Sequence, residues 1–400
     1  MGFDKNSALI LILLSLPFQF NLITDSFDLF TAEITKEWKS GRVLTYYENY
    51  FCKKITFYVA LVSAVSFVFI YYKVRKMRLI ISISFFLNAV VWLLYLASND
   101  NNIYLFYIIR GIQGVFLSIF QMSHVIYVLH FASSEIKCFC GCCFQVAMFT
   151  GLFFLNLIFF CVSWKAVAAI LAVQSIIFGG LIWIVPEMHI KPKSITKESV
   201  FQKNHIKPLL VMMLIMFLQQ LTGIGTLLGQ LASMLSGVGL DLESHLQSCL
   251  FDFVGALSTM IAAFITDSIG TRYMWSFSSV GLCIGLVIYA VTLKIETEKW
   301  VGTLGIFVYF LFYGLGEGPI PWFLSGTLFP EEVRLETAAI TICENLFLSP
   351  ILDLLWNTLN KNAGQFGSIL FSSIACILAI FLGFLIPLES RHESDGINVL

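Results

Sequence analysis

The sequence predicts an all-α membrane protein with twelve transmembrane helices in two halves of six. Composition is the first reason, because 58% of the 400 residues are hydrophobic and only 12% are charged. A soluble domain carries roughly a quarter charged residues, so lipid must cover much of this surface. The second reason is a series of apolar runs, each near the length of about 20 residues that crosses a bilayer. The twelve runs lie at about 7–24, 55–72, 79–97, 103–129, 139–161, 164–185, 208–235, 246–266, 273–293, 301–324, 335–358 and 364–386.

One polar, lysine-rich segment divides the chain. Residues 187–207 form this linker between a first half, 1–186, and a second half, 208–387, and a short tail, 388–400, follows. Lysine and arginine are enriched in cytoplasmic loops. Their distribution favours a cytoplasmic N-terminus, which also places the linker and the tail in the cytoplasm. The expected protein is therefore an integral, multi-pass membrane protein with both termini inside.

Composition and motifs argue against several other classes of protein. A net charge of −1 gives no reason to expect nucleic acid as a partner. Cys138, Cys140, Cys142 and Cys143 cluster, but no histidine or acid completes a metal shell beside them, so no metal is expected. The sequence shows no nucleophile–base pair, phosphate loop or metal-ligand set. We therefore expect neither an enzyme nor a cofactor.

The stretch Tyr313–Phe329, YGLGEGPIPWFLSGTLF, predicts a broken membrane helix. Glycines loosen a helix, and Pro319 and Pro321 each remove a backbone N–H. Such a break is tolerated in a membrane only where protein buries it or where it lines a wet cavity, and transporters place it beside the substrate. We expect Gly318, Pro319 and Pro321 to act as a hinge, and a kink that serves packing is the alternative. Glu317 lies inside the break, and an acid at this depth is a functional candidate by default.

Polar side chains follow one face of the seventh run. Buried amides cost several kcal/mol unless they find partners. Such a stripe can hold two helices together. Two adjacent glutamines among glycines favour instead a helix that faces a cavity. At helical spacing the stripe holds Gln219, Thr222, Gly223, Thr226 and Gln230, with Gln220 beside it.

These motifs resemble those of the glucose-transporter family, the sugar porters of the major facilitator superfamily. Residues 219–223, QQLTG, are similar to the family's QQLSG signature in helix seven, and residues 318–323, GPIPWF, match its helix-ten signature outright. The resemblance implies the major facilitator fold and extends along both halves. Further matches are Arg110, Gly114, Tyr127, Lys137, Gln145, Gly151, Trp164, Pro186, Glu187, Asp267, Gly270, Arg272, Arg334 and Asn345.

The resemblance also implies roles for individual residues. Amides and an indole offer neutral hydrogen bonds and a stacking face, which suit a small neutral solute rich in hydroxyl groups. We therefore expect a carrier that moves a sugar or a related polyol across the bilayer by alternating access. The implied substrate-binding residues are Gln145, Gln219, Gln220, Trp322 and Asn345. The implied charges of the cytoplasmic gate are Lys137, Asp267, Arg272 and Arg334.

The chain also departs from the family pattern. His130 and Thr327 stand where the family has gate acids, and Gly225 and Gly255 stand where it has polar asparagines. A sugar sensor of the same fold that does not transport is therefore one alternative. A carrier for a different small organic solute is another, because glycines at Gly225, Gly229 and Gly255 would widen the walls of a cavity.

The first helix bears on energy coupling. The resemblance implies that proton-driven relatives carry an aspartate at the position of Ile23, and isoleucine cannot take up a proton. Asp25 lies roughly 200° further around the helix. The sequence thus favours facilitative uniport, with Glu317 as the remaining candidate for proton binding. The plasma membrane is the expected location.

Overall fold

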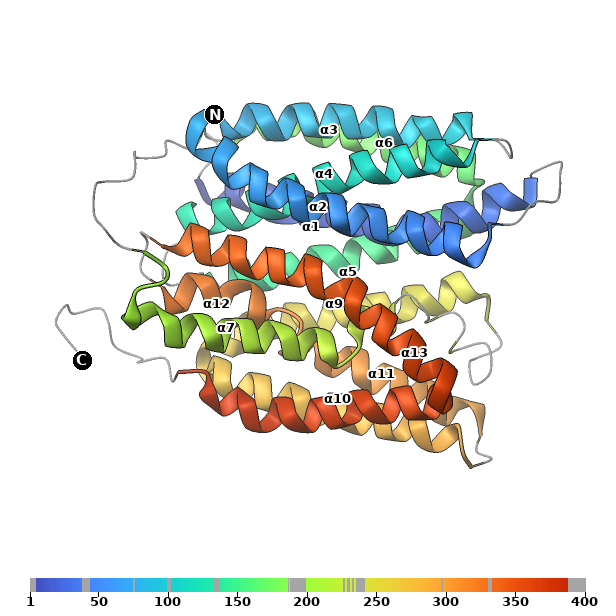
Figure 1. Cartoon of the computed structure of the whole chain (residues 1–400), viewed down its shortest axis with the longest axis vertical. Coiled ribbons are helices and arrows are strands. Elements are labelled where there is room, and N and C mark those ends of the chain that lie inside the picture. The colour runs from blue at the N-terminus through green and yellow to red at the C-terminus, as the bar shows by residue number, and fades with distance from the viewer. Residues whose placement is uncertain are drawn as a thin grey trace.

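The computed structural model describes residues 5–37, 44–74, 76–98, 102–131, 137–185, 187, 199–225, 227–228, 231, 234, 242–295, 298–329 and 333–387. All regular secondary structure in these ranges is helical. The helices lie side by side with their axes roughly along one direction, and the first and last helices begin and end at the same end of the bundle (Figure 1). The all-α fold class predicted from the sequence is confirmed.

The first half packs around α1, which contacts both α4 and α5, while α2 packs on α4 and α3 on α6. One continuous apolar core joins these helices. The helices are α1 (Lys5–Glu37), α2 (Tyr46–Val74), α3 (Met77–Leu94), α4 (Ile103–Phe131), α5 (Lys137–Cys161) and α6 (Trp164–Leu181), with short 3₁₀ turns η1 (Tyr95–Ala97) and η3 (Ile182–Ile184).

The second half contains two apolar clusters. Its last helix, α13, reverses direction at Gly364, where φ is 70°, a conformation that glycine adopts without strain. This single element therefore makes two passes. The helices are α7 (Lys203–Leu221), α9 (Ser244–Ile269), α10 (Thr271–Thr292), α11 (Lys299–Leu315), α12 (Ile320–Leu328) and α13 (Arg334–Leu382), followed by η4 (Gly383–Leu385).

The described residues include nine helices that are long and apolar enough to cross a membrane, with α11 and α12 counted together. Because α13 turns back on itself, they account for ten passes, and α1 and α7 bring the number to the predicted twelve. Helix α7 begins at Lys203, inside the segment predicted as linker.

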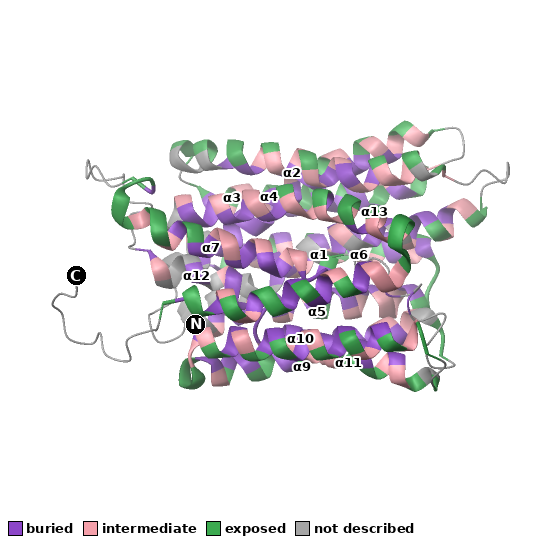
Figure 2. Ribbon diagram, turned by 60° about the horizontal axis from the view of Figure 1, so that its bottom comes forward, coloured by how far each residue is buried: buried purple, intermediate pink, exposed green. Residues whose placement is uncertain are grey.

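The outer faces of the helices are apolar. Exposed residues alternate with buried ones along most helices (Figure 2). Large side chains are among the exposed ones, and Phe69, Phe264 and Phe381 are 72%, 69% and 68% exposed. Contiguous apolar surface of this kind is rare on soluble monomers. Lipid is its natural solvent.

Contacts between the halves run mainly through α5 with α9 and through α2 with α13. A Cβ atom on Gly255 of α9 would lie 2.6 Å from Cζ of Phe149 on α5. The space beside this glycine is thus filled by an aromatic ring from the other half. The expectation that Gly255 widens a cavity is wrong, and the glycine instead permits a close contact between halves.

Candidate functional site

The helix break predicted from the sequence lies between α11 and α12. Helix α11 ends at Leu315, and α12 begins at Ile320 with Pro319 as its N-cap. The amide of Gly318 donates to the carbonyl of Tyr313 at 2.8 Å, one residue beyond the helical register. Pro321 is in the first turn of α12, where backbone N–H groups lack helical partners and proline is tolerated. The break itself is confirmed, and a hinge role for Gly318, Pro319 and Pro321 stays a prediction.

Two glycines, Gly314 and Gly316, allow the break to pack closely against α9 and α10. A Cβ atom on Gly314 would lie 2.7 Å from the carbonyl oxygen of Gly255 on α9. A Cβ atom on Gly316 would lie 2.5 Å from the carbonyl oxygen of Met274 on α10. Both distances are far inside van der Waals contact with backbone that cannot swing away. Glycine is therefore required at both positions for the break to reach its place.

Glu317 lies at the centre of the break and is fully buried. Its Oε2 atom is 3.0 Å from Thr222 Oγ1 on α7, and its Oε1 atom is 2.5 Å from Ser279 Oγ on α10. Its backbone amide donates to Ser278 Oγ at 2.8 Å. In the described part of the chain no ion pair includes Glu317. The acid is held by neutral hydroxyl groups on two other helices.

Gln219 and Gln145 approach the break from opposite halves of the protein. The side-chain amide of Gln219 on α7 donates to the carbonyls of Glu317 and Gly318, at 2.6 and 2.8 Å. Gln145 on α5 lies against Gly318, since a Cβ atom there would be 3.2 Å from Gln145 Cγ. Both side chains are at least 97% buried. The Oε1 atoms of both have no hydrogen-bond partner among the described residues.

Trp322 and Asn345 lie close to these two glutamines. The ring of Trp322 packs on Phe144, the residue before Gln145, with ring centroids 4.5 Å apart. Asn345 Nδ2 lies 3.5 Å from the sulfur of Met216, one turn before Gln219 on α7. Helix α5 of the first half and helices α7, α12 and α13 of the second half thus bring polar or aromatic side chains towards the break.

Gln220 has different surroundings. It lines a recess with Gly223, Leu352, Trp356 and Phe371, on another face of α7 from Gln219. The recess has a volume of ≈ 10 Å³, which is room for about one water molecule. The structure therefore separates Gln220 from the other four residues in this conformation.

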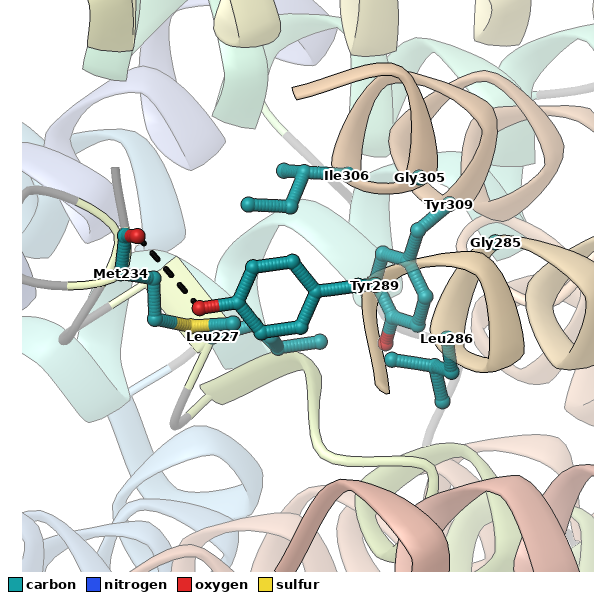
Figure 3. A pocket seen from close by; sticks show the side chains of 8 residues that line it. All are labelled: Leu227, Met234, Gly285, Leu286, Tyr289, Gly305, Ile306 and Tyr309. Atoms are coloured by element: carbon teal, nitrogen blue, oxygen red, sulfur yellow. Dashed lines mark hydrogen bonds between the residues drawn. The ribbon is translucent and has the colours of Figure 1, made fainter. Parts of the chain in front are cut away.

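A second small cavity lies between α10 and α11 (Figure 3). Apolar side chains, Gly285 and Gly305 line it, and the Tyr289 hydroxyl at its edge donates to the Met234 carbonyl at 3.4 Å. Its volume is also ≈ 10 Å³. It is too small and too apolar for a hydroxyl-rich solute.

The predicted gate charges are only partly described. Asp267 is exposed near the end of α9, and among the described residues it forms no ion pair with Arg272. Arg272 instead donates from Nε to the carbonyl of Ile386 at 2.5 Å and so ties α10 to the end of the second pass of α13. The side chains of Lys137 and Arg334 lie outside the described residues, and the gate role of all four stays a prediction.

Two buried basic side chains, Lys54 and Arg110, find their partners through tertiary packing. Lys54 on α2 forms an ion pair with Asp353 on α13, which joins the two halves. Arg110 is fully buried, and its Nη1 donates to the carbonyl of Ile23 at 2.5 Å and to Gln113 Oε1 at 3.1 Å. Lys54 and Asp353 are 299 residues apart in the sequence, and no local spacing signals such a pair.

The fold defines the class of protein. It matches the structure of a major facilitator superfamily protein, the proton:xylose symporter XylE bound to 6-bromo-6-deoxy-D-glucose, with a TM-score of 0.80 over 95% of this chain and 96% of that one, at 15% identity. An inward-open structure of XylE from E. coli gives a TM-score of 0.72 at 16% identity, over 96% of both chains. The chain has the major facilitator fold.

The family follows from the sequence of the second half. Residues 184–394, just over half of the chain, match the family described as "Sugar (and other) transporter", and the chain belongs to this family. It is 26% identical over 221 residues to the facilitated trehalose transporter Tret1 of Apis mellifera ligustica, which covers 52% of this chain and 44% of that relative. Tret1 of Bombyx mori is 25% identical over 205 residues, 49% of this chain and 40% of the relative. The match thus spans less than half the length of these relatives.

Proposed function

We propose that this protein is a carrier, and not an enzyme, that moves a sugar or a related polyol across a membrane by alternating access. The observation that carries the proposal is the convergence of Gln145 and Gln219 on Gly318. They come from opposite halves, and each holds a buried amide oxygen that lacks a partner among the described residues. A solute held between them contacts both halves at once, which is what alternating access requires.

The chemistry of these side chains favours a neutral solute with several hydroxyl groups. Each free amide oxygen accepts a hydrogen bond from a hydroxyl, and one such bond contributes about 0.5–1.5 kcal/mol. Trp322 adds an aromatic face for the apolar side of a sugar ring. Asn345 of α13 adds a further amide beside Met216, which lies one helical turn before Gln219, so that α5, α7, α12 and α13 all contribute to the proposed site.

Facilitative uniport is the transport mode that we propose. Ile23 occupies the position at which the resemblance places a proton-carrying aspartate, and its carbonyl accepts a hydrogen bond from Arg110. A backbone carbonyl does not titrate. The isoleucine at this position therefore supports transport driven by the solute gradient alone.

The relatives suggest which solutes to test first. Two of them are named facilitated trehalose transporters, so a disaccharide belongs beside monosaccharides and polyols. We propose the plasma membrane as the location, with both termini in the cytoplasm, from the distribution of lysine and arginine.

The test is uptake by the purified protein in liposomes, with a panel of labelled hexoses, trehalose and polyols. A saturable uptake of one class, reduced by the double substitution Gln145→Ala and Gln219→Ala, supports the proposal. Binding of a panel member without any uptake favours the alternative, a sugar sensor of the same fold. Neither binding nor uptake across the panel would point to a different small organic solute.

A further inference from the structure

The hydroxyl groups of Thr222 and Ser279 each lie within hydrogen-bond distance of two acceptors, one of which is a carboxyl oxygen of Glu317. Thr222 Oγ1 lies 3.0 Å from Glu317 Oε2 and 2.8 Å from the carbonyl oxygen of Gln219. Ser279 Oγ lies 2.5 Å from Glu317 Oε1 and 3.0 Å from the carbonyl oxygen of Trp275. A hydroxyl group has one proton, so each can donate to one of its two neighbours. The protonation state of Glu317 depends on which neighbour receives it.

The carbonyl of Gln219 needs the hydroxyl proton of Thr222 as its hydrogen-bond donor. In an unbroken helix the Gln219 carbonyl would accept from the amide of Gly223, but that amide donates to Gln220 at 3.1 Å. The cause is the end of α7, where Gly223 has φ of 95°. The Thr222 hydroxyl is then the donor that the described structure offers to this carbonyl. With its proton used there, Thr222 presents an oxygen lone pair to Glu317 Oε2.

A protonated Glu317 satisfies every contact in this group. Its Oε2–H donates to Thr222 Oγ1, Thr222 donates to Gln219, and Ser279 donates to Oε1. The Trp275 carbonyl still accepts a hydrogen bond from the backbone amide of Ser279 within α10. Ser278 accepts from the Glu317 amide and donates to Phe312, so it has no further proton to offer. A carboxylate would place two oxygen atoms with lone pairs against each other at 3.0 Å.

The surroundings of Glu317 also disfavour a charge. The titratable groups that face it are Tyr309 and Tyr313 of α11 and Cys376 of α13. The hydroxyls of α7 and α10 and the glutamine amides of α5 and α7 are neutral. The described residues bring no lysine, arginine or histidine into an ion pair with this acid. An unpaired charge in such a place is among the most costly features a membrane protein can hold.

We propose that Glu317 is a proton-binding site, protonated in this conformation, and that the proton links the helix break to α7. When the proton passes to water in alkaline medium, the carboxylate can no longer donate to Thr222 and this link is lost. The conformation seen here is then disfavoured. Since a carrier must pass through all its conformations, we expect uptake to fall. This inference deepens the proposed function, and only its transport readout depends on that function.

Infrared spectroscopy of the purified protein tests the proton directly. At neutral pH the wild-type protein should show the carbonyl stretch of a protonated carboxylic acid, and the Glu317→Gln variant should lose intensity in that band. Glu298→Gln is the matched control, because Glu298 is exposed at the start of α11 and should not contribute. Equal intensity of the band in the wild type and in Glu317→Gln overturns the proposal. This measurement does not require transport, so it stands or fails independently of the solute.

Uptake into liposomes with the same pH on both sides tests the consequence. Wild-type uptake should fall by about two- to tenfold at alkaline pH, as expected for the loss of one buried hydrogen bond. Glu317→Gln should vary less, because an amide keeps its N–H donor at every pH. Size-exclusion chromatography confirms that the variant is folded. If uptake falls equally at alkaline pH in the wild type and in Glu317→Gln, the pH effect arises from another group, and the proposed role of the Glu317 proton is overturned.

Discussion

Lys54 on α2 and Asp353 on α13 form an ion pair that crosses from one half of the protein to the other. Lys54 is 4% exposed, and its ammonium group also lies 5.7 Å from the ring centroids of Tyr50 and Phe57. It is thus a buried cation with a single acidic partner described. Under the proposed alternating access, any movement that separates α2 from α13 would have to break this pair.

Removing either charge of this pair should destabilise the protein and ease the separation. Lys54→Ala removes the lysine partner of Asp353, and we expect a loss of about 2 kcal/mol, below the value of about 3–5 kcal/mol for fully buried pairs because Asp353 is 27% exposed. The thermal midpoint in detergent measures this loss. Exchanging the two residues, Lys54→Asp with Asp353→Lys, should restore part of it. No recovery in the exchanged variant would show that the contact acts through packing rather than charge.

The two adjacent glutamines of α7 should respond differently to truncation. Gln219→Ala and Gln145→Ala each remove an amide at the break, and we expect solute binding to weaken by about 0.5–1.5 kcal/mol, or several-fold. Gln219→Ala should have the larger effect, because its amide also holds the carbonyls of Glu317 and Gly318. Gln220→Ala is the control, since Gln220 lines a separate recess. Titration of labelled sugar measures all three, and a Gln220→Ala effect as large as that of Gln219→Ala would contradict the separation.

Substitution of Gly316 should damage the fold itself. A Cβ atom there would lie 2.5 Å from the Met274 carbonyl, and overpacking of this kind costs about 1–3 kcal/mol. We expect Gly316→Ala to lower the thermal midpoint and the yield of folded protein. Gly225→Ala is the matched control, because a Cβ atom on Gly225 meets nothing within 4 Å. Equal stability of the two variants would show that α10 and α11 can move apart without penalty.

Local sequence pattern predicted the features that have local causes. Apolar runs gave the helical passes, and the glycines and prolines of 314–321 gave the break between Leu315 and Ile320. Resemblance to a family added the convergence of Gln145 with Gln219, two residues that no local pattern connects. The passes and the break could be predicted because helix length and missing amides can be read without knowing which helices touch. The shared substrate-binding role of Gln145 and Gln219 stays a prediction.

What the sequence could not supply are contacts set by tertiary packing. The hydroxyls of Ser278 and Ser279 reach Glu317 from 39 and 38 residues away, and nothing in their spacing marks them as its partners. From the sequence, Gly255 indicates a wider cavity. The ring of Phe149 fills this space instead, and it belongs to the other half of the protein, which no local pattern reveals. In each case the sequence shows the residue type, but the neighbour that determines its role belongs to a distant segment of the chain.

The two prolines of the break should control the rate of transport more than the stability of the fold. Pro319 is the N-cap of α12 and Pro321 lies in its first turn, where missing N–H groups cost little. Replacing both with alanine allows α11 and α12 to approach a continuous helix, so we expect slower turnover with normal expression. Initial uptake velocity in liposomes measures this effect. Pro350→Ala, inside α13, is the control for proline loss away from the break. An unchanged velocity in the double variant would mean that the prolines only serve packing.

Energy coupling gives the last prediction. If the protein is a uniporter, the solute should reach the same concentration inside and outside the liposomes, whatever the pH difference across the membrane. The structural reason is that Ile23 offers only a carbonyl to Arg110 and that the proton of Glu317 is enclosed by Thr222 and Ser279. A proton that remains on Glu317 throughout the cycle changes the rate of uptake with pH, but it does not change the final distribution of solute.

The measurement is uptake with an imposed pH step, inside alkaline, compared with uptake at equal pH. We expect the two time courses to differ in rate and to end at the same plateau. Accumulation above the outside concentration, abolished by a protonophore, would overturn uniport. Repeating the step with Glu317→Gln then locates the carrier of the proton. If accumulation disappears in this variant, the Glu317 proton must be released and rebound in each cycle, and the enclosure by Thr222 and Ser279 would describe only one stage of it.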